Sequence, residues 1–392
     1  MKKRAYVRKE FLRNLGILLG SLLVFFLGTE GILRLLYPEA LSVQRRFPQG
    51  MYCKPDRLFG WIGLPNVSAT LSPPADAQDM EAMRVAMNGE GFLDDSHPVS
   101  RPAGVHRLLF LGDSFTIGLG IPKTKRFTDL IKDDLQPGWT VMNMGMWGYS
   151  TDQELLVLEE KGLKYAPEVV VLCMFMDDVF CNNLFSVNDG IYIKPRFSLG
   201  AKEELLLGNV PVPNNHGRSA LVNLILTRFY KLRNRLEMGA EFNRRGWISV
   251  YDTKYLAQGR YLLTLRLLAE IHALAKAHGM DFLLVIVPDK DQLLEQQITA
   301  RGAGYGGIPP RRLDLRLPQK VVRLFCEQLG IPVLDLLPAF KRYQGPEALF
   351  FEHDLHWTRA GHRLAAGEML KRLRQLGYLG RAFNGSETKR SQ

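Results

Sequence analysis

Five short apolar runs recur after residue 105, and each is followed by a segment with the spacing of an amphipathic helix. The runs cover residues 108–111, 141–143, 169–175, 282–287 and 333–336. The helical segments cover residues 128–135, 152–162, 261–278, 318–329 and 360–376. Continuous apolar strands separated by helices indicate a parallel sheet covered on both faces. We therefore predict an α/β domain over residues 105–380, with three αβα layers and a flavodoxin-like strand order.

The N-terminus carries a different pattern, in which a basic flank at residues 1–14 precedes an apolar run at 15–36. A helix that crosses a bilayer needs about 20 mostly apolar residues. No small-residue cleavage pattern follows Gly28, which favours an uncleaved signal anchor over a cleaved signal peptide or a buried helix. Because basic flanks stay in the cytoplasm, the rest of the chain is expected on the far side of the membrane.

The remaining segments are predicted as appendages of the α/β domain. Residues 37–104, rich in Pro, Gly, Ser and Asp, are expected to form a stalk and an edge segment. Residues 186–258 interrupt the strand and helix rhythm, and are interpreted as an insertion with a helix at 219–235 and no clear strand. Since an insertion at the strand ends of such a sheet covers the ligand crevice, substrate selection is expected there. Residues 381–392 are expected to be a flexible tail.

Charge and cysteine placement exclude some classes of function. The net charge is +11, but the basic residues are spread along the chain and their clearest cluster precedes the apolar run, so no nucleic acid is expected as a partner. Cys173 and Cys326 lie in apolar settings typical of buried thiols, while Cys53 and Cys181 are left open as possible disulfide partners. No CxxC or His/Cys cluster is present, and we expect neither a metal nor a cofactor.

Gly112, Asp113 and Ser114 directly follow the first predicted strand. In an open parallel sheet, ligands bind beyond the carboxyl ends of the strands, so Ser114 is where a nucleophile could be presented. The triplet alone is weak evidence, because a serine in a strand-to-helix turn is common. A loop with Gly145 and Gly148 follows the second strand, and its glycines could serve the backbone or let an N–H group approach a substrate oxyanion.

A third feature is Asp354-x-His356, just before a helix that Thr358 could cap. In extended backbone, residues i and i+2 project to the same side, so the carboxylate can orient the imidazole. An acidic neighbour of histidine is also common on surfaces. His353 and His362, which flank the pair, are interpreted as structural.

Together these features resemble the SGNH (GDSL) hydrolase family over about residues 84–376. Gly112-Asp113-Ser114 with Gly118 resembles its first block, Asn143-x-Gly145-x-x-Gly148 its second, and Asp354-x-His356-Trp357 its last. The membrane helix resembles a bacterial envelope branch, and the DxHW spelling is similar to alginate O-acetylation proteins of the group. The resemblance implies Ser114 as nucleophile, His356 as general base, Asp354 as its orienter, and Gly148 with the Ser114 amide as oxyanion donors.

One position departs from the family pattern. Asp177 stands where the family places an asparagine that donates to the oxyanion, and an ionised carboxylate cannot donate. Either Asp177 is protonated, or Asn182 or Asn183 replaces it, or the hole has only two backbone donors. Losing one donor typically lowers the rate by about 100- to 1000-fold.

The resemblance implies a serine esterase or O-acyltransferase that acts on an ester, expected to be acetyl, of an envelope polysaccharide or glycolipid. Its expected place is a bacterial inner membrane, with one membrane span and a periplasmic catalytic domain. The expected partners are an acylated carbohydrate or lipid, the membrane and, for acyl transfer, a membrane protein that delivers acyl groups. The alternative is a weakly active or inactive carbohydrate-binding or assembly protein of the same fold, which Asp177 supports.

Overall fold

A computed structural model describes residues 2–36, 53–73, 79–187, 192–208, 219–300 and 304–380 of the chain. Its centre is a five-stranded sheet in the order β13-β12-β7-β5-β6, with every neighbouring pair parallel. The strands are β5 (His106–Gly112), β6 (Trp139–Asn143), β7 (Val169–Phe175), β12 (Asp281–Val287) and β13 (Val333–Asp335). The predicted flavodoxin-like sheet is therefore confirmed, and each strand lies within a residue or two of its expected place.

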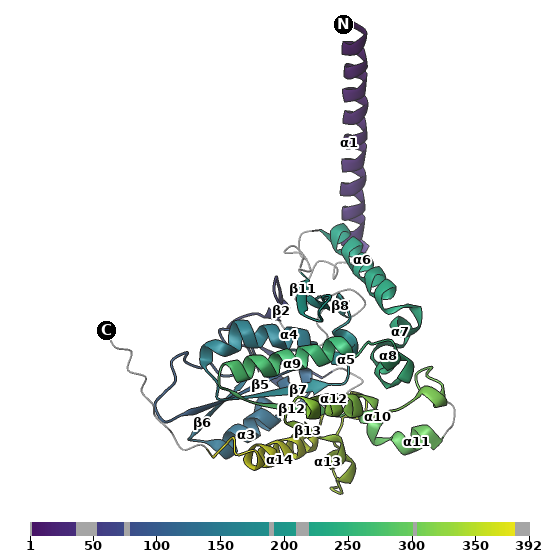
Figure 1. Ribbon diagram of the computed structural model, residues 1–392. Helices are drawn as coiled ribbons and strands as arrows, with labels where there is room; N and C mark the ends of the chain where they lie inside the picture. Colours follow the sequence, from purple (N-terminus) through teal and green to yellow (C-terminus); the bar gives the residue numbers. More distant parts are fainter. Residues whose placement is uncertain are drawn as a thin grey trace.

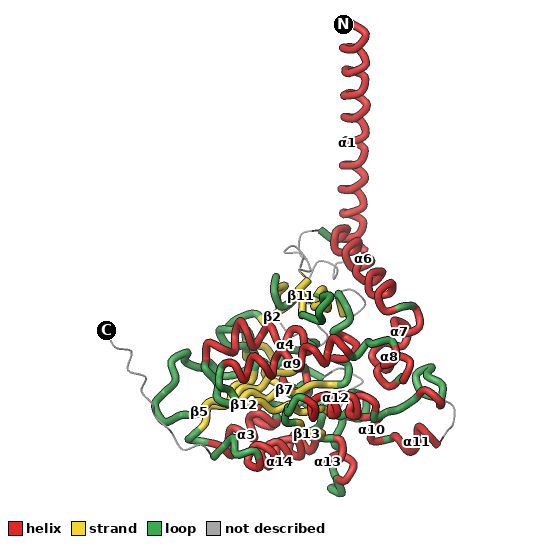
Figure 2. The backbone as a smooth tube through the Cα atoms, in the orientation of Figure 1, coloured by secondary structure: helices red, strands yellow, loops and turns green. Residues whose placement is uncertain are grey.

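Helices cover both faces of this sheet (Figures 1 and 2). One face carries α4 (Thr151–Val157), α9 (Leu262–Ala277) and α12 (Leu317–Gln328). The opposite face carries α3 (Phe127–Leu135), α13 (Leu337–Arg342) and α14 (Arg359–Gln375). The expected helix at 152–162 is α-helical only to Val157, after which the chain continues as a π-helical turn over Leu158–Gly162.

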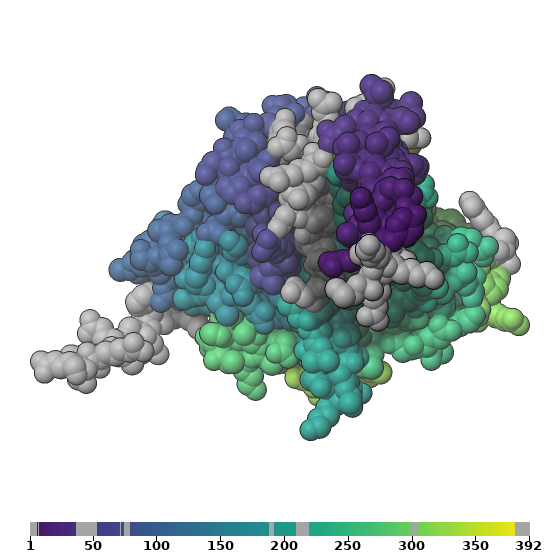
Figure 3. Space-filling view, turned by 90° about the horizontal axis from the view of Figure 1, so that it is seen from above, coloured from purple at the N-terminus to yellow at the C-terminus, as the bar shows by residue number. Residues whose placement is uncertain are grey.

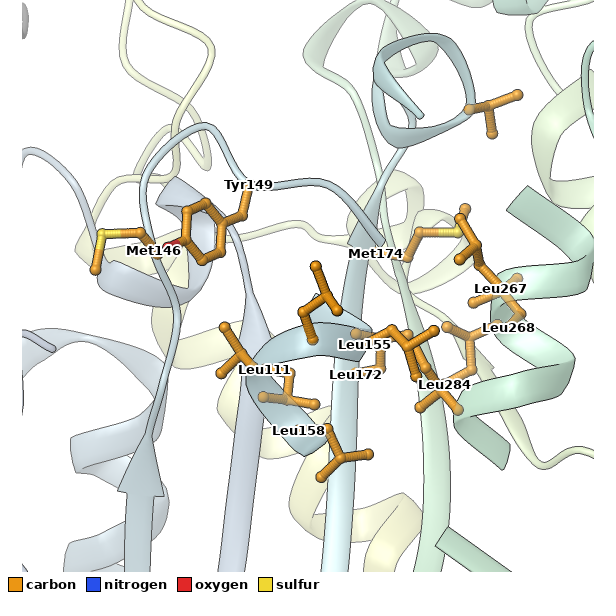
Figure 4. Close-up of a cluster of buried hydrophobic side chains, with 14 of the residues drawn as sticks. Leu111, Met146, Tyr149, Leu155, Leu158, Leu172, Met174, Leu267, Leu268 and Leu284 are labelled. Carbon is orange, nitrogen blue, oxygen red and sulfur yellow. The ribbon is translucent and has the colours of Figure 1, made fainter. Parts of the chain in front are cut away.

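Alternate residues of the strands supply the two cores. Leu109 and Leu111 of β5 face α4 and α9, while Leu108 and Phe110 face the opposite layer. Figure 4 shows the first core, where leucines of the α4 segment and of α9 point toward leucines of β5, β7 and β12. These strand side chains have almost no exposed surface, which explains why the strands read as unbroken apolar runs.

The described part of the predicted stalk is built into the domain. It forms two antiparallel hairpins, β1 (Cys53–Asp56) with β2 (Gly60–Gly63), and β3 (Ser68–Leu71) with β4 (Met83–Ala86). Trp61 and Met83 are buried in the same core as β5 and β7. Residues 37–52, the first part of the expected stalk, lie outside the described residues.

The prediction of no strand within 186–258 is wrong. The segment contains β8 (Ser186–Val187), β9 (Tyr192–Ile193), β10 (Arg196–Leu199) and β11 (Leu205–Gly208), which pair as two hairpins. Strands of two to four residues are too short to show an alternating pattern in sequence. Helices α6 (Ala220–Met238), α7 (Ala240–Arg245) and α8 (Thr253–Ala257) follow, and α6 begins where a helix was expected.

Helix α1 (Lys2–Leu36) projects from one face of the domain, and that face is seen from above in Figure 3. Its part from Arg8 to Leu36 is long and apolar enough to cross a membrane, and the side chains of this part are almost all exposed. The four cysteines are free thiols, so Cys53 and Cys181 do not pair. The tail at 381–392 lies outside the described residues.

Candidate active site

Ser114 is placed by a tight turn at the carboxyl end of β5. The next residues form the short helix α2 (Ser114–Ile117), and the Asp113 side chain accepts a hydrogen bond from the Phe115 amide at 2.9 Å. Gly112 is needed for close approach, because a Cβ atom there would lie 2.1 Å from Thr116 Oγ1. The turn thus fixes the serine at the sheet edge where ligands of parallel sheets bind.

His356 reaches Ser114 from the other end of the domain sequence. Its Nε2 atom lies 2.7 Å from Ser114 Oγ, and its Nδ1 atom is hydrogen-bonded to Asp354 Oδ1. The same carboxylate oxygen accepts the His356 amide at 2.8 Å, which fixes the i, i+2 geometry of the pair. Burial raises the pKa of Asp354, but the hydrogen bonds and charge of His356 outweigh burial and hold that pKa below its usual value. The structure therefore places the Ser114 hydroxyl against one nitrogen of the His356 ring and the ionised Asp354 carboxylate against the other.

Trp357 anchors this histidine. It is fully buried against Phe115, which follows Ser114, and the Phe115 ring also contacts His356 at a centroid distance of 4.9 Å. The Thr358 side chain caps α14, as expected, by accepting a hydrogen bond from Gly361. The aromatic packing thus links the turn of Ser114 to the segment of His356. This explains why a tryptophan follows the histidine in the DxHW motif.

The two other histidines of this segment lie apart from the reacting pair. His362 is buried, and its Nδ1 atom accepts the Phe127 amide at 3.2 Å. Burial lowers the pKa of His362 to about 3, so it is a neutral acceptor that fixes α14 against α3. His353 is exposed, and its ring lies near Glu352, with 3.9 Å between Nε2 and Oε1.

Gly148 lines the pocket in front of Ser114. Its φ of 68° favours glycine, whereas space is less restrictive, since a Cβ atom would meet only the Trp61 ring at 3.5 Å. The neighbouring amides of Gly145 and Met146 are engaged with Asn143 Oδ1 and the Gly112 carbonyl, each at 2.9 Å. Gly148 is thus the glycine of this loop that stands at the pocket wall.

Asn143 holds the two loops together rather than facing the pocket. Its Nδ2 atom donates to the Thr116 carbonyl at 2.7 Å and to Thr128 Oγ1 at 3.0 Å. It therefore fixes the end of β6 against α2 and α3, and through them the Ser114 turn.

Asp177 also lines the pocket, just after β7. Burial and the nearby charge of Asp289 raise the pKa of Asp177 to about 7, while Lys194 opposes the shift. Asn182, one of the alternatives to Asp177, is buried outside the pocket lining, where its side chain accepts from the Asp152 amide and donates to Thr264 Oγ1. Asn183 is likewise engaged with the carbonyls of Val179 and Arg260.

A buried ion pair between Lys194 and Asp152 lies behind this wall, and both side chains have no exposed surface. Burial raises the pKa of Asp152 to about 6, and Lys194 limits the rise. Neighbouring Glu154 and Asp178 are also buried, and burial with repulsion from nearby carboxylates raises both of their pKa values well above normal. Glu154 and Asp178 are close enough to Asp177 for their charges to interact with it. In the sequence, Asp152 and Glu154 appeared only as the polar start of a helix.

The pocket has a volume of about 410 Å³, and aromatic side chains form part of its wall. Three tryptophans contribute, Trp61 from the N-terminal hairpin, Trp147 beside Gly148, and Trp247 from the insertion. Trp61 Nε1 donates to the Trp147 carbonyl at 2.9 Å, which ties the hairpin to the loop that carries Gly148. Sequence reasoning missed Trp61 and Trp247, since nothing local marks a tryptophan as facing a distant serine.

The sheet order and the arrangement around Ser114 define the SGNH hydrolase fold, a class of esterases and acyltransferases. The matching family model is an SGNH hydrolase-like domain, that of acetyltransferase AlgX, and it covers residues 244–391. That range includes Asp354 and His356 but not Ser114. No curated protein matches the chain by sequence.

Solved structures similar to the chain include TesA, an acetylxylan esterase and a lipase/acylhydrolase. TesA is 15% identical over 69% of this chain and 99% of its own, with a TM-score of 0.39. A catalytic mutant of Axe2, an acetylxylan esterase from Geobacillus stearothermophilus, is 15% identical over 68% and 94%, with a TM-score of 0.39. A lipase/acylhydrolase from Enterococcus faecalis is 16% identical over 69% and 97%, with a TM-score of 0.37.

Proposed function

We propose that the chain is a serine esterase or O-acyltransferase that acts on an ester of an envelope polysaccharide or glycolipid. The observation that carries the proposal is the 2.7 Å contact between His356 Nε2 and Ser114 Oγ, with Asp354 on the other ring nitrogen. This is the order of groups that activates a serine hydroxyl for attack on a carbonyl carbon.

The proposed reaction has two steps. His356 takes the Ser114 proton as Oγ bonds to the ester carbonyl carbon, and the imidazolium then gives this proton to the leaving alkoxide as the ester C–O bond breaks. In the second step, water or a sugar hydroxyl loses its proton to His356 as its oxygen bonds to the acyl carbon, and the imidazolium returns this proton to Ser114 Oγ as the bond between the acyl carbon and Oγ breaks. Water as acceptor gives hydrolysis, and a sugar hydroxyl gives acyl transfer.

Gly148 and the Ser114 amide are the proposed donors to the oxyanion, as the family resemblance implies. Asp177 is the proposed third donor while it is protonated, and its pKa of about 7 supports this role in neutral or mildly acidic solution. Once ionised, the carboxylate would instead repel the negative charge that develops on the substrate oxygen.

The pocket supports an acyl group next to a sugar. Its volume of about 410 Å³ suits a small ester better than a long acyl chain with its headgroup. Trp147 and Trp247 offer flat apolar faces beside the polar Ser114 and Asp177, a combination that suits the apolar face and hydroxyl groups of a pyranose ring. We therefore favour an acetyl ester of a carbohydrate.

The proposal includes the place of the chain in the cell envelope. Helix α1 is proposed as an uncleaved anchor with its basic end in the cytoplasm and the domain in the periplasm of a bacterial envelope. A reporter fused to the C-terminus should be active only outside the cytoplasm, and the chain should stay in the membrane fraction after a carbonate wash. A reporter active only in the cytoplasm would overturn this topology.

A fluorophosphonate probe on the detergent-solubilised full chain tests the chemistry. The probe should label Ser114, and peptide mapping should find the adduct there. Ser198→Ala, an exposed serine on β10, is the control and should label like wild type, whereas Ser114→Ala should not label. Labelling that persists in Ser114→Ala would place the nucleophile elsewhere.

The alternative is an envelope carbohydrate-binding or assembly protein that keeps the fold without turnover. Asp177 in the pocket favours it, because an ionised acid there opposes an oxyanion. An unlabelled Ser114 together with sugar binding that survives Ser114→Ala would select this alternative.

A further inference from the structure

The carboxylate of Glu30 joins the C-terminal part of α1 to the N-terminal turn of α6. Glu30 accepts hydrogen bonds from Ser219 Oγ at 2.8 Å and from the amides of Ala220 and Leu221 at 2.9 Å each. Arg34 pairs with the same carboxylate at 2.7 Å. A carboxylate at a helix N-terminus satisfies its free amides and suits its dipole. The first turn of α6 is therefore held against α1.

This joint lies at the level where α1 leaves the proposed bilayer. A span of about 20 residues, counted from the start of the apolar run at Leu15, ends near Arg34. Glu30 comes before the end of α1 at Leu36 by about 9 Å, given a rise of about 1.5 Å per residue. The N-terminus of α6 is thus placed at the membrane interface, and Figure 1 shows α6 running from the foot of α1.

Helix α6 presents an apolar stripe to solvent. Its opposite face, with Tyr230 and Met238, is buried against the domain. Apart from Leu224, the exposed apolar residues recur at spacings of three and four, which puts them on one side of the helix. They are Val222, Ile225, Phe229, Leu232 and Leu236. Leu236 is 74% exposed, which is as open as the lipid-facing residues of α1 itself.

Basic residues border this stripe on one side. Arg228, Lys231 and Arg235 follow the stripe along α6, and with Arg244 of α7 they line a groove of about 850 Å³. Leu232 of the stripe and Glu241 line the same groove. An apolar stripe beside a basic border is the pattern of helices that lie in a membrane interface, where the cations meet anionic headgroups.

We propose that α6 is a second membrane contact, which lays its apolar stripe into the leaflet that α1 leaves and sets its basic border on anionic lipid phosphates. The inference rests on the proposed membrane anchor. The stripe begins at Val222, directly after the residues that Glu30 of α1 binds, and this closeness to the anchor selects the lipid of the same membrane as the occupant. Lys231 and Asn243 line both the groove and the pocket of Ser114, so the contact holds the pocket beside the membrane surface.

Spin labels on the full chain in lipid nanodiscs test this contact. One nanodisc type contains phosphatidylcholine with phosphatidylglycerol, and each disc holds a single chain. Labels are placed by Ile225→Cys and Phe229→Cys on the stripe, and by Leu324→Cys on α12 as a control with similar exposure, 59% against 56% for Ile225. Val24→Cys on α1 reports the anchor. The unsubstituted chain, in which Cys53, Cys173 and Cys326 are buried, sets the labelling background.

Collision with oxygen and with a water-soluble nickel complex reports the depth of each label. The stripe labels should favour oxygen over nickel, as the Val24 label does, whereas the Leu324 label should favour nickel. Stripe labels as nickel-accessible as the Leu324 label, with the Val24 label still in lipid, would overturn the contact and leave the anchor standing. This outcome would also result if the stripe binds another protein instead. A nickel-accessible Val24 label would remove the anchor and the contact together.

A charge variant tests the basic border. Arg228→Gln with Arg235→Gln should lower the ratio of lipid-buried to exposed Ile225 label in anionic nanodiscs by about fivefold per arginine. The control pair Arg311→Gln with Arg323→Gln removes the same charge from exposed positions outside the contact and should leave the ratio unchanged. Equal loss in both pairs, or the same loss in pure phosphatidylcholine nanodiscs, would contradict a role for the arginines at anionic lipid.

Discussion

His356 Nε2 lies within hydrogen-bond distance of Ser114 Oγ, at 2.7 Å, although 242 positions separate the two residues in sequence. The contact forms because β5 ends at the Ser114 turn and the segment before α14 returns to the same sheet edge. Phe115 and Trp357 pack between the two segments and hold them together.

The first prediction concerns this pair. Ser114→Ala and His356→Ala should each remove nearly all turnover of a small acetyl ester, by a factor on the order of 10⁴ or more, without unfolding the chain. The double variant should be scarcely worse than either single variant, because each residue is useful only through the other. His353→Ala changes an exposed histidine nearby and serves as the control. Multiplicative losses in the double variant would show that the pair does not act as a unit.

The second prediction concerns Asp354. Asp354→Asn keeps the shape but removes the charge that fixes the ring of His356, so kcat should fall by about 10³- to 10⁴-fold. Glu352→Gln removes a neighbouring exposed charge and should change kcat by less than twofold. Steady-state kinetics on both variants checks this, and a loss below tenfold in Asp354→Asn would mean that the carboxylate does not orient the base.

The third prediction concerns Asp177, whose pKa burial and Asp289 raise to about 7. If the acid donates to the oxyanion only when protonated, activity falls as pH rises through about 7, which opposes the gain from a neutral His356. Asp177→Asn supplies a donor at every pH, and should keep or raise activity at pH 7 and extend it to higher pH. The pH-rate profiles of the two proteins test this, and complete inactivation by the substitution would give the carboxylate a positive role.

Stability offers an independent readout of Asp177. The folded pKa of about 7 lies above the ordinary value of 3.8, so the carboxyl group destabilises the fold increasingly as pH rises from about 4 to about 7, and the cost is constant above that. Asp177→Asn should therefore match wild type near pH 4 and show a higher melting temperature at pH 8. Equal melting temperatures at both pH values would place the carboxylate in a solvated setting.

The fourth prediction concerns the buried pair of Lys194 and Asp152. Lys194→Met removes the partner of a buried carboxylate, and should destabilise the fold by about 3–5 kcal/mol at pH 8. The loss should shrink at pH 5, where Asp152 takes up a proton. Adding Asp152→Asn should recover part of the stability at pH 8, which denaturant unfolding measures. Lys202→Met, an exposed lysine of the same insertion, is the control, and an equal loss there would exclude the pair as the cause.

The sequence by itself determined the sheet. Strands such as β7 and β12 are buried on both faces, so their apolar runs are unbroken and visible without any contact being known. It also supplied Ser114, Asp354 and His356 as candidates, because a turn after a strand and an i, i+2 pair are local patterns. The short hairpins of the insertion escaped, since two to four residues carry no period.

Only the tertiary structure decided what surrounds those candidates. Trp61 and Trp247 meet at the pocket from segments far apart in sequence, and Asn182, close to Asp177 along the chain, turns away into the interior. The pKa of Asp177 depends on burial and on Asp289, and the contact of the first turn of α6 with α1 depends on Glu30. Local patterns record the backbone preferences of neighbouring residues. The solvation of a side chain, the charges around it and the shape of a cavity instead depend on groups that are distant in sequence. These properties are therefore set only when the chain has folded.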